Sequence, residues 1–332
     1  MHFQKHISLL RCPACQSGLL LNDGELECLG TKRAFPIENG IPHLFLPNEW
    51  ETGKADVTVE VRDFYEKTPF PNYDEFDSVA TLVLKSQARR FTRLLDEQVP
   101  LGTKILEVGC GTGQLSNFLS IAQRAVFGTD MCLNSLALAE DFRRKNHLSR
   151  VSFYQMNLFR PIFGEQTFDL VIANGVLHHT SDPFEGFKSI ARLVKKGGYI
   201  LVGLYNKYGR LMTELRRVIF RASGKRFLFL DPYLSKRSGN DSKTRAWFED
   251  QYYHPYESKH TMREVLKWFD KTGFGFINSI PKNKFMQPFT DKEELFAPTP
   301  RVDSLTLAAV EAHTVLTGIR EGGLFIMIGQ RM

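Results

Sequence analysis

Short apolar runs alternate with amphipathic segments along most of the chain. Runs rich in β-branched, aliphatic and aromatic residues predict buried strands at residues 105–108, 125–129, 151–156, 168–173, 199–204, 274–280 and 323–329. Apolar residues recur at helical spacing between several of these runs, for example over residues 115–122 and 133–147. Strands that alternate with helices are typical of an α/β fold, here a doubly wound, mostly parallel sheet of seven strands with helices on both faces.

A glycine-rich turn follows the first of these strands, with Gly109, Gly111 and Gly113 at alternate positions. Glycine permits positive φ and lets a ligand approach the backbone, and doubly wound domains bind ligands at the carboxyl ends of their strands. A dinucleotide fingerprint would need its third glycine where Gln114 stands, and Glu107 lies at the strand end. A carboxylate repels a pyrophosphate and attracts an ammonium group, so the turn favours a ligand with an ammonium group.

The second strand ends at an acidic residue, Asp130. A carboxylate at this edge of the sheet can accept hydrogen bonds from both hydroxyls of a ribose. The same position also suits a cap for the helix that begins near Leu133. Both interpretations place Asp130 beside the glycine turn.

Two segments carry a family resemblance. KILEVGCGTGQLS, residues 104–116, resembles motif I of class I S-adenosylmethionine-dependent methyltransferases, and NGVLHHTSDP, residues 174–183, resembles motif IV of their small-molecule and lipid-type members. The resemblance implies a Rossmann-like sheet whose final strand is antiparallel and lies beside the fifth. It implies S-adenosyl-L-methionine as cofactor. The residues that it assigns to cofactor binding are Glu107, Gly109, Cys110, Gly111, Gly113, Asp130, Met131, Asn157, Leu158 and Asn174.

Within that set the resemblance gives some residues a particular role. Met131 is expected against the adenine, and the carbonyl of Asn174 near the methionine ammonium group. Asn157, where the family commonly has aspartate, is expected to accept a hydrogen bond from the adenine amino group and to donate one to a ring nitrogen.

Histidines supply the candidate catalytic groups. His178 and His179 follow the fourth strand, and a histidine there can take the proton from an attacking hydroxyl because its pKa lies near working pH. His254, with Tyr253 and Glu257, is a candidate for orienting the nucleophile. The alternatives are that the pair packs its loop and that the later segment is a hydrogen-bonded lid.

The amino-terminal segment carries a zinc-ligand spacing, Cys12-Pro13-Ala14-Cys15, followed by Cys28. Thr31 stands where a fourth thiolate would complete a ribbon, so these three cysteines form an incomplete set of candidate metal ligands and the spacing does not favour zinc. Residues 8–47 resemble the small zinc-ribbon-like activator subunit of tRNA, ribosomal RNA and release-factor methyltransferases. This resemblance implies that the segment packs on the catalytic domain, where it stabilises it or shapes substrate entry.

The chain is expected to divide into a ribbon-like module at 1–50, a linker and aromatic cap at 51–100, and a methyltransferase domain at 101–332 with an insertion at 205–261. A single helix over 79–97 is expected to lead into the glycine turn. The aromatic residues of the cap either cover the cofactor or plug the sheet edge. They are Phe64, Tyr65, Phe70, Tyr73 and Phe76.

Residues 210–226 predict a basic amphipathic helix. Leu211, Leu215, Val218, Ile219 and Ala222 share its apolar face. Its other face carries Arg210, Arg216, Arg217 and Arg221, with Lys225 and Arg226 following. A basic face of this kind can bind a phosphate, an acidic lipid surface or RNA. Alternatively it faces solvent while the other face makes a homodimer contact.

Composition changes this picture little. The net charge of +6 permits an anionic partner without requiring one, and five cysteines argue against a disulfide framework. Neither a signal-peptide core nor an apolar run of membrane-spanning length is present, so we expect a cytoplasmic protein. The first expectation for function is methyl transfer to a small organic or lipid-like acceptor. RNA or a translation protein is the alternative acceptor, and a non-enzymatic cofactor-binding scaffold is the third interpretation.

Overall fold

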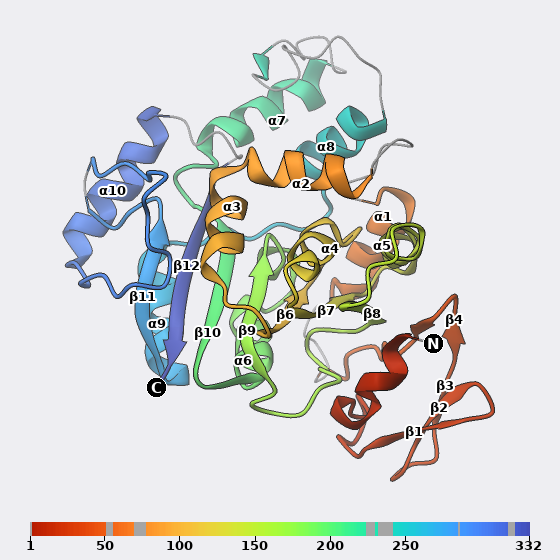
Figure 1. Ribbon diagram of the computed structural model, residues 1–332. Coiled ribbons are helices and arrows are strands. Elements are labelled where there is room, and N and C mark those ends of the chain that lie inside the picture. Colours follow the sequence, from red (N-terminus) through yellow and green to blue (C-terminus); the bar gives the residue numbers. More distant parts are fainter. Residues whose placement is uncertain are drawn as a thin grey trace.

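The computed structural model describes residues 2–50, 56–69, 78–223, 230–231, 242–284, 286–317 and 323–332. Its centre is a seven-stranded sheet in the order β11-β12-β10-β9-β6-β7-β8 (Figure 1). The strands are β6 (Lys104–Val108), β7 (Ala125–Asp130), β8 (Val151–Gln155), β9 (Phe168–Asn174), β10 (Val194–Tyr205), β11 (Phe274–Ile280) and β12 (Leu324–Arg331). Strand β12 is antiparallel to both β10 and β11, which confirms the predicted fold class.

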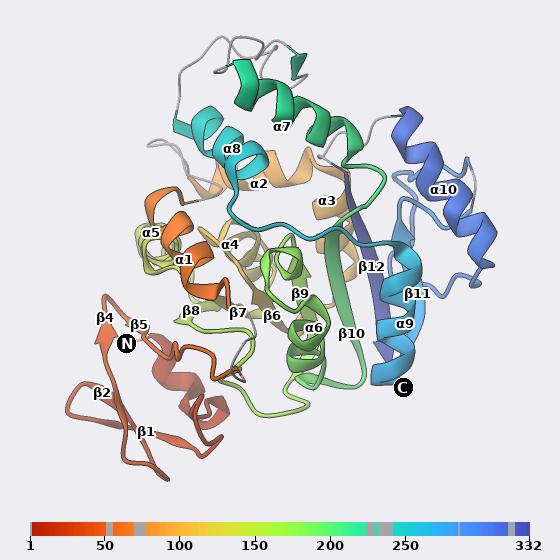
Figure 2. The same ribbon diagram turned by 180° about the vertical axis from the view of Figure 1, so that it is seen from behind.

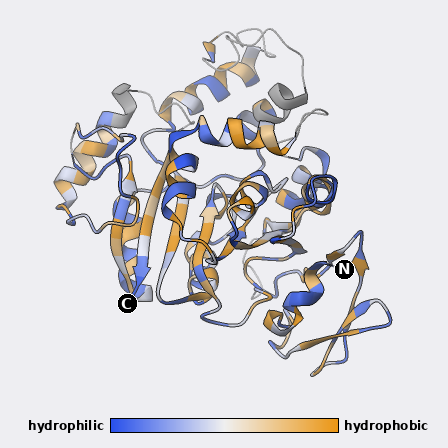
Figure 3. Ribbon diagram, viewed as in Figure 1, coloured by the Kyte–Doolittle hydropathy of each residue, from blue (hydrophilic) through white to orange (hydrophobic). Residues whose placement is uncertain are grey.

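Both faces of the sheet are covered, because alternate residues of each strand enter different apolar layers. Ile105 joins the layer under α3 (Arg90–Gln98), α4 (Gln114–Ile121) and α5 (Leu133–Lys145), whereas Leu106 joins the layer under α6 (Pro183–Ala191) and α9 (Met262–Thr272). The apolar colour of the central strands is visible in Figure 3. The parallel strands therefore present their carboxyl ends, and the turns that follow them, at one edge of the sheet.

The amino-terminal residues form a small β-rich module. It comprises η1 (His2–Leu9), a three-stranded sheet of β1 (Leu19–Asn22), β2 (Glu25–Cys28) and β3 (Ala34–Phe35), and the pair β4 (Ile37–Glu38) and β5 (Ile41–Pro42). The module is joined to the large domain through backbone hydrogen bonds of Arg11 to Ile162 (2.7 Å) and Leu44 to Gln155 (3.2 Å). Phe3 shares one buried core with Phe127 of the large sheet. Packing of this segment on the domain is thus observed, and the exact division into three units stays a prediction.

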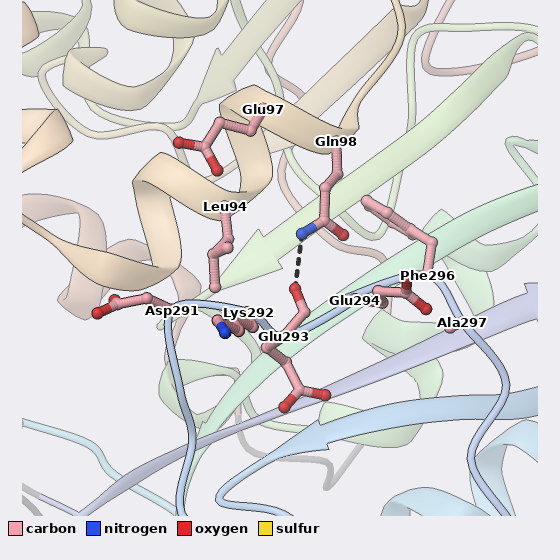
Figure 4. A pocket seen from close by; sticks show the side chains of 9 residues that line it. All are labelled: Leu94, Glu97, Gln98, Asp291, Lys292, Glu293, Glu294, Phe296 and Ala297. Atoms are coloured by element: carbon pink, nitrogen blue, oxygen red, sulfur yellow. Dashed lines mark hydrogen bonds between the residues drawn. The ribbon is translucent and has the colours of Figure 1, made fainter.

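The single helix predicted over 79–97 is wrong, because the chain forms two helices there. They are α2 (Val79–Gln87) and α3, separated at Arg89, whose backbone is extended. Helix α2 packs on α4, whereas Arg90 and Gln98 of α3 hydrogen-bond residues 289–295. Different tertiary partners at the two ends override the continuous helical pattern. A shallow surface pocket of about 440 Å³ between α3 and residues 291–297 is lined by no predicted site residue (Figure 4).

Candidate functional site

The glycine turn and Asp130 form one hydrogen-bonded unit. Gly109, Gly111 and Gly113 all have positive φ, at 65°, 53° and 70°. The carboxylate of Asp130 accepts hydrogen bonds from the backbone N–H of Gly111 (2.8 Å) and of Cys132 (2.9 Å). Asp130 therefore fixes the turn and the start of α5 together, and its partly exposed side chain lies at the carboxyl end of β7.

A second carboxylate, Glu107, lies buried below the turn and accepts a hydrogen bond from the hydroxyl of Ser116. Burial raises the pKa of Glu107 to about 7, against the lowering effect of Ser116, and the nearby Asp130 raises it further. Burial also raises the pKa of Asp130, although backbone N–H groups oppose this. A buried carboxylate next to a partly exposed one favours a ligand that brings positive charge or hydroxyl donors.

Asn174, at the end of β9, offers a buried acceptor. Its Oδ1 has no hydrogen-bond partner among the described residues, and its side chain lies where a Cβ at Gly203 would be. Nearby, Val176 fills the space that a side chain at Gly109 would need. An orphaned buried oxygen at the end of β9, with carboxylates at the ends of β6 and β7, fits a ligand that has an ammonium group and a ribose.

The remaining predicted cofactor residues contribute differently. Cys110 is buried within the turn, and the carbonyl of Met131 accepts a hydrogen bond from Gln155 Nε2 (3.0 Å). Leu158 packs against Gly186 of α6. Asn157 donates both amide hydrogens, to Leu46 O (2.8 Å) and Asn48 Oδ1 (2.7 Å). In this structure both amide hydrogens of Asn157 bind the segment that follows the amino-terminal module, and the expected donation to an adenine nitrogen stays a prediction.

Helix α1 (Thr58–Lys67) lies beside this site and joins two other helices. The carboxylate of Glu66 accepts hydrogen bonds from the backbone N–H of Leu133 (2.7 Å) and Asn134 (3.0 Å) at the start of α5. The hydroxyl of Tyr65 donates to Asp250 (2.7 Å) of α8 (Ser242–Tyr253). Of the predicted aromatic cap, Phe64 and Tyr65 belong to α1, and Phe70, Tyr73 and Phe76 lie outside the described residues.

The three candidate catalytic histidines come together in space. His178 and His179 form η2 (Leu177–His179) after β9, and His254 follows α8. Ring centroids are 4.2 Å apart for His178 and His179 and 3.7 Å apart for His179 and His254. All three are buried, and burial lowers the pKa of His178 well below its usual value, lowers that of His179, and lowers that of His254 to about 2. The cluster is consequently neutral near pH 7.

Hydrogen bonds assign the tautomers of these rings. His179 Nδ1 faces the carbonyl oxygen of Tyr256 (2.9 Å), so Nδ1 donates and Nε2 is left as an acceptor. His178 and His254 accept at Nδ1 from the backbone N–H of Tyr205 (3.4 Å) and Tyr256 (3.2 Å), so each carries its proton on Nε2. Both of these Nε2 atoms are buried without a hydrogen-bond partner among the described residues. The cluster thus combines one acceptor nitrogen with two N–H donors.

A buried ion pair supports the cluster, and the sequence did not reveal it. Arg210, whose side chain is 0% exposed, binds Glu257 through two hydrogen bonds of 3.0 and 2.6 Å and lies 3.9 Å from the ring centroid of Tyr205. Gln251 accepts from Arg210 (2.6 Å) and donates to the hydroxyl of Tyr205 (2.8 Å). The available signal was a run of polar residues between aromatic ones in WFEDQYYHPYE, residues 247–257, although the side chain of Trp247 lies outside the described residues.

The three amino-terminal cysteines also meet. The sulfur atoms of Cys12, Cys15 and Cys28 all lie within 4.8 Å of one another, and no fourth histidine, cysteine or carboxylate joins them among the described residues. The backbone N–H of Thr31 donates to Cys28 Sγ (3.3 Å). Three soft thiolates fit zinc, but a closed structural site needs four ligands. That zinc is not favoured at this cluster therefore stays a prediction.

Comparison with known families agrees with this geometry. Residues 106–202 match the family described as "Methyltransferase domain", and residues 4–40 match that described as "Trm112p-like protein". Residues 106–202 of this chain form an S-adenosylmethionine-dependent methyltransferase domain. Both predicted resemblances are confirmed, and so is the predicted cofactor, S-adenosyl-L-methionine.

The relatives of this methyltransferase are distant. An uncharacterized protein of Synechococcus is 24% identical over 206 residues, which are 55% of this chain and 49% of that protein. A demethylmenaquinone methyltransferase of Bacillus licheniformis is 27% identical over 233 residues, 69% of this chain and 91% of that enzyme. Among solved structures, PKMT2 from Rickettsia typhi in complex with AdoHcy shares the fold, with a TM-score of 0.53, 12% identity, and 79% of this chain and 55% of that one covered. In the described residues of this methyltransferase, no helix has the length and apolar character needed to cross a membrane.

Substituting Gly113 with alanine is expected to lower the free energy of unfolding by about 2–4 kcal/mol. The new Cβ would lie 2.7 Å from Cβ of Ala139 and 2.8 Å from the ring of Phe153, at a φ of 70°. Gly102→Ala is the matched control, because its φ is 76° and nothing lies within 4 Å. Urea denaturation should show a loss of only about 1 kcal/mol for the control, from backbone strain alone. Equal losses for both variants would contradict a tightly packed turn.

Proposed function

We propose that this methyltransferase transfers the methyl group of S-adenosylmethionine to a hydroxyl or ring carbon of a small, lipid-like aromatic acceptor. The observation that carries the proposal is the buried cluster of His178, His179 and His254, neutral and surrounded by the rings of Tyr65 and Tyr205. Neutral aromatic rings of this kind suit a flat organic ring better than a charged polymer.

In this proposal the cofactor is held by the unit around the glycine turn. The carboxylate of Asp130 binds the ribose hydroxyls, and Asn174 Oδ1 accepts a hydrogen bond from the ammonium group. Glu107, Gly109, Cys110, Gly111 and Gly113 shape the turn, with Met131 and Leu158 at its border. When bound, the sulfonium supplies an electrophilic methyl carbon.

The chain's own residues then prepare the acceptor. His179 Nε2 accepts the acceptor's hydroxyl proton, while the Nε2–H groups of His178 and His254 donate to a second acceptor oxygen. Helix α1, held by Glu66 and Tyr65, keeps water out and holds the reacting groups in line, and alignment of this kind supplies several kcal/mol.

The relatives support the acceptor class at a coarse level. The matched Bacillus licheniformis enzyme is named for demethylmenaquinone, a small molecule with a quinone ring. By analogy with this enzyme we propose a quinone-like acceptor. Two further proposals come from the sequence: a cytoplasmic location for the chain, and a division into units 1–50, 51–100 and 101–332. Transfer to tRNA, ribosomal RNA or a translation protein is the second candidate, favoured by the Trm112p-like match over residues 4–40.

A tritiated-methyl transfer assay tests the acceptor. The purified chain is incubated with labelled S-adenosylmethionine and with lipid extract, RNA or protein from a strain that lacks it. We expect label in the lipid extract, with little effect of salt. Label in RNA, with an activity that falls steeply as salt rises, would overturn the proposal in favour of the second candidate. Binding of S-adenosylhomocysteine without label in any fraction would favour a scaffold.

His179→Gln is expected to lower kcat at least about 100-fold, because a positioned base contributes roughly that much, while cofactor affinity stays unchanged. His147→Gln, an exposed histidine on the same domain, is the control and should keep full activity. The base must be neutral to accept a proton, and burial lowers the pKa of His179. The rate should therefore hold as pH falls to 6.5 and decline only below it. An inflection at or above pH 6.5, or a fully active variant, would contradict this role.

A further inference from the structure

Helix α7 (Leu211–Ser223) has the opposite orientation from the one its basic residues predict. Arg210 and Arg217 point inward, where both bind Glu257, and Thr213 and Phe220 are the buried side chains of the helix. Lys225 and Arg226, which the sequence places after the helix, lie outside the described residues. The predicted orientation of this helix, with its basic face outward and its apolar face inward, is therefore wrong.

The side that faces out is apolar. Leu211, Leu215 and Val218 are 53%, 54% and 64% exposed, and Tyr208 and Met212 extend the same side, which we call the α7 stripe. The spacing of three and four residues places these side chains on one face of the helix. Of the predicted apolar set only Ile219 packs inward, against the small core that α7 shares with α8. A contiguous apolar stripe of this kind on a surface helix marks an interaction site.

The charges at the border of the α7 stripe are positive. Among residues 207–223 the exposed charged side chains are Lys207 and Arg221. The carboxylate of Glu214 is neutralised by Arg217 (2.8 Å) and Lys259 (3.0 Å). Lys207 also interacts electrostatically with the carboxylate of Glu264. The surface thus combines exposed apolar groups with exposed cations, the combination by which an amphipathic helix lies in the interface of an anionic bilayer.

The position of α7 suits such a role. It follows β10 at the carboxyl end of the parallel strands, and both ribbon views show it as an outer element beyond α2 and α8 (Figures 1 and 2). The amino-terminal module lies at the opposite end of the molecule (Figure 2). A membrane that meets the α7 stripe would therefore face the side of the domain that carries the histidine cluster.

We propose that the α7 stripe docks the protein on the surface of an anionic lipid bilayer. Leu211, Met212, Leu215 and Val218 enter the headgroup region, and Lys207 and Arg221 pair with anionic headgroups. The attachment is peripheral and reversible, and it does not depend on which acceptor is methylated.

Vesicle co-sedimentation of the full chain tests this. Binding is measured to phosphatidylcholine vesicles with and without 30% phosphatidylserine, at low and high salt. We expect at least tenfold stronger binding to the anionic vesicles, weakened by salt. Leu215→Gln/Val218→Gln should lower this binding at least tenfold, and Lys207→Gln/Arg221→Gln should remove most of its salt dependence. Leu20→Gln/Leu29→Gln is the matched control, since those leucines of the amino-terminal module are 55% and 54% exposed.

Three results would overturn the proposal. Equal vesicle binding by Leu215→Gln/Val218→Gln and by the control Leu20→Gln/Leu29→Gln would show that the stripe is not the contact. A dimer in light scattering that Leu215→Gln/Val218→Gln dissociates would make the stripe an interface between copies. A large fall in thermal stability for that variant would show that the stripe packs inside the chain. Calorimetry with S-adenosylhomocysteine, run on the same samples without vesicles, separates failure of docking from failure of the methyltransferase assignment.

Discussion

Asp130→Ala is expected to weaken binding of S-adenosylhomocysteine at least about 100-fold, beyond the range of routine calorimetry. The substitution removes the two charge-assisted hydrogen bonds that the carboxylate accepts from the ribose, which together are worth about 3 kcal/mol. Each 1.4 kcal/mol corresponds to a factor of ten in affinity. The substitution also leaves the N–H groups of Gly111 and Cys132 without their acceptor, so the turn that shapes the pocket loosens.

A matched control separates this loss from a general effect of removing a carboxylate near α5. Asp141 lies on that helix with its side chain 42% exposed, and it pairs with Lys145 at 2.7 Å. Asp141→Ala should bind the ligand as the unmodified chain does. If Asp130→Ala unfolded cooperatively and still bound with near-normal affinity, the cofactor would lie elsewhere, and the assignment of the glycine turn would fail.

Local patterns predicted the sheet because each strand, turn and helix carries its own signal. The run Lys104–Val108, the three glycines and Asp130 lie within 27 consecutive residues, and parallel βα geometry brings them together without further information. The same holds for His178 and His179, which follow β9 directly. Their meeting with His254 needs only that the insertion after β10 returns to the same edge of the sheet.

Long-range partners explain what prediction from sequence missed. Asn157 matches a cofactor position by its place after β8, and its amide binds Leu46 and Asn48 from the segment that follows the amino-terminal module. Arg210 reads as one of a row of surface cations, but Glu257, 47 residues later, draws it inside. A helical wheel shows which residues share a face, and only the position of the paired carboxylate decides which face points inward.

Glu257→Gln is expected to lower the free energy of unfolding by about 3–5 kcal/mol, because removing one partner leaves a buried charge uncompensated. Both Arg210 and Arg217 bind this carboxylate. The side chain of Arg210 is fully buried, so water does not reach it to take the place of the lost carboxylate. The exposed pair of Asp270 and Arg301, 2.6 Å apart, gives the control: Asp270→Asn should cost no more than about 1 kcal/mol.

The pH dependence of the same variant distinguishes a buried ion pair from lost packing. Burial opposes the charge of Glu257, but Arg210 and Arg217 outweigh it and lower the pKa of the carboxyl. A group with a lowered pKa adds stability above its unfolded value, about 4.3 for glutamate, and loses that contribution as pH falls through the folded value. Urea denaturation should therefore show a constant gap between the unmodified chain and Glu257→Gln from pH 6 to 8, and a shrinking gap below about pH 4. A gap that stays the same in acid would mean that the glutamine disturbs packing and that the carboxylate charge stabilises nothing.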